Sequence, residues 1–186
     1  MKVLFKITAV AISLLTLSCA QKEMKISRAN VSIKTEITDF SPAYITKNND
    51  GSIAVNKNNL IGNTHWVLSV DRSLTLKEIA QPLQELLDKK FHKEGMHEDT
   101  KDIYIVYSDT LHKNNAYLKL PFKNIVFTND AQDLILLNGN EDLLSITLNS
   151  KLGFQQNATF EDFVNKLIVL DQSNKGISIE KELYLY

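Results

Sequence analysis

The hydrophobic pattern of the chain changes its period along the sequence, and this alternation constrains the fold more than any other feature. Residues 31–37 alternate apolar and polar side chains, which is typical of a half-buried strand. The period becomes helical over residues 75–87, and it becomes helical again over residues 159–170. Strand-like segments surround both helical stretches. The sequence therefore predicts an α+β fold, with mostly antiparallel sheet and two amphipathic helices.

Both predicted helices begin at a threonine that an acidic residue follows three positions later. Thr75 and Glu78 form one such pair, and Thr159 and Asp162 form the other. In a capping box of this kind, the hydroxyl and the carboxylate accept hydrogen bonds from amides at the helix start. Pro82 lies inside the first helical stretch, where we expect it to kink the helix or to separate its first turn.

The element order occurs twice. Asp50-Gly51 and Asn138-Gly139-Asn140 each lie between strand-like segments, and both predict hairpin turns. Residues 52–107 and 134–186 then share the order strand, turn, strand, Thr-capped helix, strand. They could be two diverged ββαβ repeats, or the same order could arise without duplication.

The N-terminal residues follow a different pattern. Lys2 and Lys6 form a short basic start, and residues 7–17 are apolar and uncharged. A basic start followed by roughly 7–15 apolar residues is the layout of a secretory signal peptide. The apolar run is shorter than the about 20 residues that span a bilayer as a helix. We therefore expect residues 1–18 to be a signal peptide.

The residues around Cys19 resemble the lipobox of bacterial lipoproteins, in which a small residue precedes the lipidated cysteine. Ser18 and Cys19 match that pattern, whereas Thr16 occupies the position where the family has leucine. The resemblance implies that Cys19 carries a diacylglycerol thioether and an amine acylated with palmitate or a similar fatty acid. Ala20, where other lipoproteins have aspartate, implies placement in the outer membrane. Alternatively, an ordinary signal peptidase could cut before Gln21 and leave no lipid.

The rest of the chain has the composition of a globular protein, with 44% hydrophobic and 23% charged residues. We expect residues 19–30 to form a lipidated tether and residues 31–186 to form the globular α+β domain. Cys19 is the only cysteine, so no disulfide can form within the chain. Without Lys2 and Lys6, 19 basic residues stand against 22 acidic ones. This charge balance lacks the excess of basic residues by which proteins bind nucleic acid, so we expect no nucleic-acid partner.

Few residues suggest chemistry, and no motif for a nucleophile elbow, phosphate loop or dinucleotide site occurs. His92 and His97 are weak candidates for a metal site, because they are five residues apart and a solvated loop explains them equally well. Glu161 and Asp162 could form a catalytic pair, but acids also belong in the first turn of a helix. We therefore expect no catalytic site, no metal and no cofactor. Four tyrosines could form an aromatic surface or belong to the core: Tyr104, Tyr107, Tyr184 and Tyr186.

These observations favour a lipid-anchored protein of the cell envelope, held in the outer membrane and facing the periplasm or the cell surface. Its domain is expected to be a non-enzymatic binding or interaction module with a protein partner in the envelope. Two other functions are compatible with the same sequence. One is a hydrolase that acts on envelope or extracellular polymers, and the other is an inhibitor or immunity lipoprotein.

Overall fold

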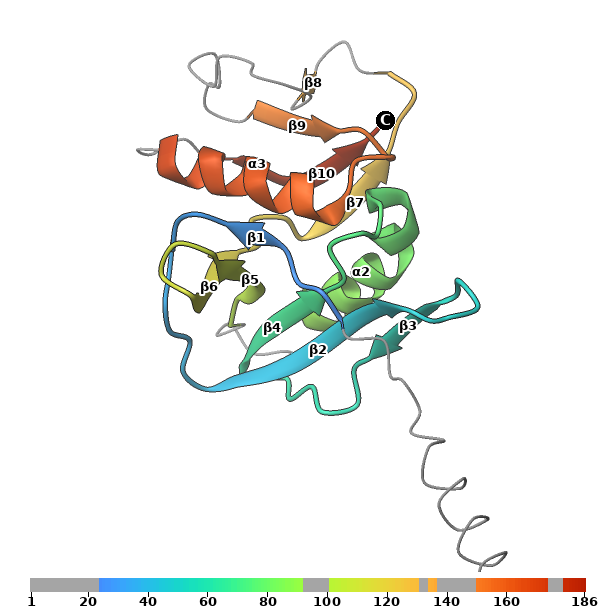
Figure 1. Ribbon diagram of the computed structural model, residues 1–186. Helices are drawn as coiled ribbons and strands as arrows, with labels where there is room; N and C mark the ends of the chain where they lie inside the picture. Colours follow the sequence, from blue (N-terminus) through green and yellow to red (C-terminus); the bar gives the residue numbers. More distant parts are fainter. Residues whose placement is uncertain (1–23, 92–100, 131–133, 137–149, 174–178) are drawn as a thin grey trace, which may run out of the picture.

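The computed structural model describes residues 24–91, 101–130, 134–136, 150–173 and 179–186 (Figure 1). The elements in chain order are β1 (Arg28–Ala29), β2 (Phe40–Lys47), β3 (Ile53–Asn56), β4 (His65–Val70), α2 (Leu76–Phe91), β5 (Ile103–Asp109), β6 (Asn114–Lys119), β7 (Asn124–Phe127), β8 (Leu134–Leu136), β9 (Ser150–Phe154), α3 (Phe160–Ser173) and β10 (Ile179–Leu185).

The strands form two sheets. The first sheet has the order β1-β5-β4-β2-β3, and β6 also pairs with β5. Its two antiparallel pairs, β2-β3 and β5-β6, are hairpins of consecutive strands. The second sheet has the order β7-β10-β9-β8, and each of its neighbours runs parallel. The predicted α+β class, with two helices and extensive sheet, is confirmed.

The expectation of mostly antiparallel pairing is wrong, because six of the eight pairs among the described strands are parallel. The reason lies in the helices. In β4-α2-β5 and in β9-α3-β10, the helix carries the chain back so that the next strand runs parallel to the one before. Strand β4 also has buried side chains on both sheet faces, as strands of parallel sheets have.

The predictions for the N-terminal part of the domain need two corrections. Residues 31–37 form no strand, and their backbone pairing with the first sheet is one isolated bridge, Lys34 to Tyr117. Part of the predicted tether, residues 19–30, is folded: β1 lies within it and pairs with β5. The alternating pattern of residues 31–37 instead reflects a segment that lies against the first sheet, where Ile37 is buried.

Both predicted capping boxes are present. The amide of Glu78 donates to the Thr75 hydroxyl at 3.3 Å, and the Thr75 amide donates to the Glu78 carboxylate at 2.8 Å. Thr159 and Asp162 repeat this exchange at 3.1 and 3.3 Å. Helix α2 continues from Leu76 to Phe91 without interruption, so Pro82 does not separate its first turn.

The two helix starts also pair with each other. Thr75 and Thr159 form an isolated antiparallel bridge, and the hydrogen bonds around it are reciprocal. The amide donors and carbonyl acceptors are Leu76 to Ala158 (3.0 Å), Phe160 to Leu74 (2.7 Å), Lys77 to Gln156 (2.9 Å) and Glu161 to Arg72 (3.3 Å). Each helix start thus gives free first-turn amides to the loop before the other helix. Equivalent positions differ by 84 residues (159 − 75), as expected of the repeats 52–107 and 134–186, but their duplication stays a prediction.

The hairpin predicted around Asp50-Gly51 is confirmed between β2 and β3, where Gly51 has a φ of +87°. The second predicted hairpin, around Asn138-Gly139-Asn140, lies outside the described residues. Strand β8, which precedes it, pairs in parallel with β9.

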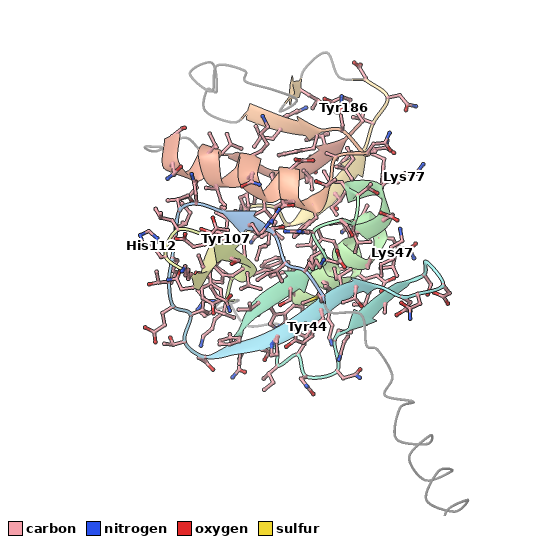
Figure 2. The ribbon with its side chains drawn as sticks, viewed as in Figure 1. Tyr44, Lys47, Lys77, Tyr107, His112 and Tyr186 are labelled. Carbon is pink, nitrogen blue, oxygen red and sulfur yellow. The ribbon has the colours of Figure 1, made fainter. Side chains whose placement is uncertain are left out.

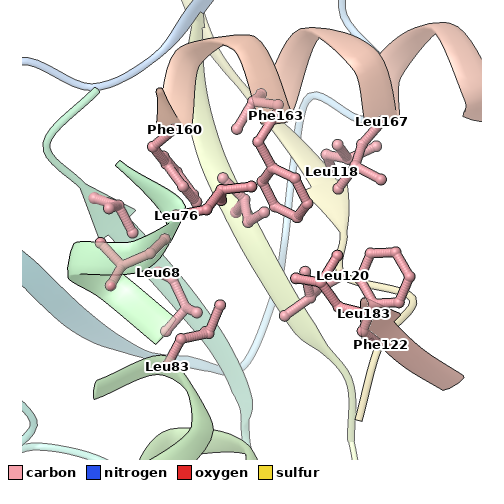
Figure 3. Close-up of a cluster of buried hydrophobic side chains, with 14 of the residues drawn as sticks. Leu68, Leu76, Leu83, Leu118, Leu120, Phe122, Phe160, Phe163, Leu167 and Leu183 are labelled. Carbon is pink, nitrogen blue, oxygen red and sulfur yellow. The ribbon is translucent and has the colours of Figure 1, made fainter. Parts of the chain in front are cut away.

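A hydrophobic core extends from the first sheet through the helices to the second sheet. In Figure 3, Phe160, Phe163 and Leu167 of α3 point toward side chains of α2, β6 and β10. All belong to one buried cluster, which also contains Trp66 of β4 and Phe154 of β9. The second sheet is therefore attached to the first through both helices, since Ile125 of β7 also donates a hydrogen bond to Gln84 of α2 at 2.7 Å.

Candidate functional site

The two faces of the first sheet differ in what covers them. The inner face carries the main core, whereas a smaller cluster of Ile37, Val67, Tyr104 and Val106 lies on the outer face. Residues 26 and 37, from the segment before β2, supply the cover of this smaller cluster. Ile26 and Ile37 pack over side chains of β4 and β5, and Phe40 and Tyr44 on the outer face of β2 remain exposed.

Three apolar side chains lie on this open face at alternate positions of β2, and we call them the β2 strip: Phe40, Pro42 and Tyr44. Phe40 is 44% exposed and Tyr44 is 38% exposed, while Pro42 is half-buried. The residues at the alternate positions, Ser41, Ala43 and Ile45, point inward and are buried. Figure 2 shows Tyr44 on the strand at the margin of the fold. The β2 strip thus leaves apolar surface exposed along one face of the sheet, where a contact can form.

A hydrogen-bonded cluster lies at the opposite edge of the same sheet, in the β5-β6 turn (Figure 2). Asp109 is fully buried, and its carboxylate accepts hydrogen bonds from the Ser32 hydroxyl at 2.5 Å and from His112 Nδ1 at 2.7 Å. The backbone amides of Leu111 and His112 donate to its other oxygen at 2.9 and 3.1 Å. The Ser32 hydroxyl, followed by the His112 contacts and the Leu111 amide, holds the pKa of the Asp109 carboxyl well below its usual range, against the effect of burial.

This cluster has the residue types of a hydrolase triad in a different order. In such a triad the imidazole lies between the hydroxyl and the carboxylate and removes the proton of the nucleophile. Here the carboxylate lies in the middle, and the Ser32 hydroxyl donates a hydrogen bond to Asp109. The imidazole of His112 therefore does not activate Ser32. The cluster instead holds the β5-β6 turn against the N-terminal segment that contains Ser32.

We expect Asp109 to contribute to the acid sensitivity of the fold. A carboxyl whose pKa is lower in the folded than in the unfolded chain, where it is about 3.9, stabilises the fold above that value and loses this contribution as the pH falls. Denaturant midpoints measured at pH 6 and pH 2.5 should thus differ less in Asp109→Asn than in the wild type. Glu36→Gln, at an exposed site on the N-terminal segment, should leave the difference unchanged. An equal pH response in both variants would contradict this assignment.

Lys90 is buried, and among the described residues its ammonium contacts backbone carbonyls and not a carboxylate. The Lys90 ammonium donates to the carbonyl oxygens of Gly62 at 2.9 Å and Thr64 at 2.7 Å, and it lies 4.8 Å from the centre of the Trp66 ring. Burial lowers the pKa of Lys90, and nearby Asp102 partly opposes this effect. Because both acceptors belong to the loop between β3 and β4, these hydrogen bonds hold that loop against α2.

A depression of about 410 Å³ lies at the start of α3, among Phe154, Gln155, Asn157, Ala158, Asp162, Phe163 and Lys166. Its acidic member, Asp162, is engaged in the capping box with Thr159. The depression therefore lacks a carboxylate that is free for acid–base chemistry, and we assign it no reaction.

The sequence candidates are not brought together. Cys19, His92 and His97 lie outside the described residues. Glu161 contacts Arg28 at 3.0 Å and Arg72 at 3.5 Å, and it forms no pair with Asp162.

The four tyrosines do not share one surface. Tyr104 lies on the outer face of the first sheet and Tyr107 on its inner face, while Tyr184 and Tyr186 belong to the second sheet or follow it. Within the described ranges, no three histidine, cysteine or acidic side chains are grouped as metal ligands. No helix in those ranges has the length and apolarity needed to cross a membrane.

Comparisons with known proteins give no relative. No family model, no curated protein and no solved structure matches the chain.

Proposed function

We propose that this chain is a lipid-anchored protein of the bacterial cell envelope whose α+β domain is a non-enzymatic interaction module. The observation that carries the proposal is the β2 strip, where Phe40 and Tyr44 remain exposed on a sheet face. Fully burying an exposed phenylalanine contributes roughly 1.5–3 kcal/mol, and covering the part of Phe40 and Tyr44 that remains exposed would contribute about half of that for each ring. The arrangement of Ser32, Asp109 and His112 favours this interpretation over a hydrolase.

The anchor part of the proposal is supported by the residues that end at Cys19. A basic start, an apolar stretch and Ser18-Cys19 provide what a lipoprotein signal peptide requires. One acyl chain binds a membrane only marginally, whereas two or more hold a protein stably. A triacylated Cys19 would thus keep the domain at the outer membrane.

Lipidation is tested by metabolic labelling with a fatty-acid analogue, followed by separation of membrane and aqueous fractions. We expect the wild type to be labelled and almost wholly membrane-bound, because each buried methylene contributes about 0.8 kcal/mol. Cys19→Ala should lose the label and leave the membrane fraction. Ser18→Ala keeps a small residue before the cysteine and should behave as the wild type. An unlabelled protein whose mature N-terminus is Gln21 would refute the anchor.

A further inference from the structure

We propose that the β2 strip rests on the membrane that carries the lipid, with Phe40 and Tyr44 in the interfacial layer of the bilayer. This inference depends on the proposed function, since it requires a lipid on Cys19. It deepens that proposal by naming the occupant of the interaction surface.

The described chain begins beside the β2 strip. The carbonyl of Lys25 accepts a hydrogen bond from the Arg72 amide at 2.8 Å, and the amide of Asp71 donates to Ile45 at 2.9 Å. Ile45 directly follows Tyr44 in β2. The next residue of the N-terminal segment, Ile26, packs against the outer-face cluster. The chain therefore enters the domain on the face that carries the β2 strip.

The connection from the lipid to this entry point is short. Six residues separate Cys19 from Lys25 (25 − 19), and six residues span at most about 22 Å, whatever path they take. A compact domain of this length has a radius of gyration of about 15 Å, hence a diameter of roughly 40 Å. The tether is thus shorter than the domain is wide. The point where the chain enters the domain must therefore lie within about 22 Å of the bilayer surface, which brings the outer face of the first sheet close to it.

The chemistry of the strip suits that position. Aromatic side chains concentrate at the membrane–water interface, and tyrosine combines an apolar ring with a polar hydroxyl. The acidic residue beside Phe40, Asp39, is paired with Lys101, so it does not leave an uncompensated negative charge against the lipid headgroups. Because the contact is aromatic, we expect it to form on zwitterionic lipid without anionic lipid.

The experiment uses the single cysteine of the chain. Because the sulfur of a lipidated Cys19 is a thioether, Tyr44→Cys introduces the one free thiol for a fluorophore in the full-length lipoprotein. Phe127→Cys provides the matched control, because Phe127 is an exposed aromatic residue (56%) that ends β7 in the second sheet. Each labelled protein is inserted into phosphatidylcholine vesicles with a headgroup nitroxide. We expect quenching at position 44 to be at least twofold stronger than at position 127.

Several outcomes separate this inference from the proposed function. If the lipoprotein sediments with the vesicles and both positions are quenched equally, the membrane contact is overturned while the anchor stands. A photocrosslink in cells from position 44 to an envelope protein, without quenching in vesicles, also overturns it in favour of a protein partner. A protein without fatty acid, which does not sediment, overturns both proposals. If Tyr44→Cys fails to fold, Phe40→Cys gives the same readout from the other end of the strip.

Discussion

Replacing Phe163 by alanine is expected to lower the free energy of unfolding by about 3–5 kcal/mol, the usual cost of removing a buried phenylalanine. Phe163 is fully buried, and its ring centre lies 4.9 Å from that of Phe154, 5.7 Å from Phe160 and 6.4 Å from Phe122. These contacts join α3 to β9 and to the segment that connects β6 with β7. Because domains have 5–15 kcal/mol of stability in total, the variant should unfold at a much lower denaturant concentration.

Val169 provides the control on the same helix. Its side chain is 43% exposed, so Val169→Ala removes little buried surface and should change the free energy of unfolding by no more than about 0.5 kcal/mol. Both variants are measured by urea unfolding followed by far-ultraviolet circular dichroism. Similar midpoints for the two variants would show that α3 does not hold the sheets together.

The helix starts could be predicted from the sequence because their signal is local. Thr75 and Glu78 are three residues apart, and so are Thr159 and Asp162, and the geometry of one helical turn brings each pair into contact. The same locality made the turn at Gly51 predictable. No information from distant parts of the chain is needed for either feature.

Strand pairing could not be predicted in this way, because the partner of each strand is distant in sequence. The run His65–Val70 is buried on both faces because α2 covers one face and Ile26 and Ile37 cover part of the other. The alternation of residues 31–37 predicted a strand. In the structure these residues form a segment without strand pairing, and Ile37 packs against the outer face of the first sheet. Alternation reports burial on one side, and it does not identify the hydrogen-bonding partner.

The open face of β2 could not be predicted for a related reason. Residues 40–45 contain apolar side chains at both odd and even positions, so the pattern does not indicate which face is open. The open face is decided by Ile26 and Ile37, which cover β4 and β5 but leave β2 exposed. The contact of Ser32 with Asp109 spans 77 residues and has no local signal at all.

The second large effect is expected at Lys90, where packing and charge can be separated by two variants. Lys90→Ala removes three buried methylenes, at about 0.8 kcal/mol each, and leaves a cavity beside Trp66, so we expect a loss of about 2–4 kcal/mol. Lys90→Met keeps a side chain of similar length. It also removes the cost of burying an ammonium, which offsets the loss of the hydrogen bonds to Gly62 and Thr64.

Lys90→Met should therefore cost at most about 1–2 kcal/mol, clearly less than Lys90→Ala in the same urea unfolding experiment. Lys89→Met, at the half-exposed neighbouring position, should stay within about 0.5 kcal/mol of the wild type. If Lys90→Met is as damaging as Lys90→Ala, the two carbonyl contacts, and not the packed methylenes, hold the β3-β4 loop against α2. Because that loop flanks β2 through the contact of the Ile61 amide with Ser41 at 3.2 Å, its release would also disturb the strand that carries the β2 strip.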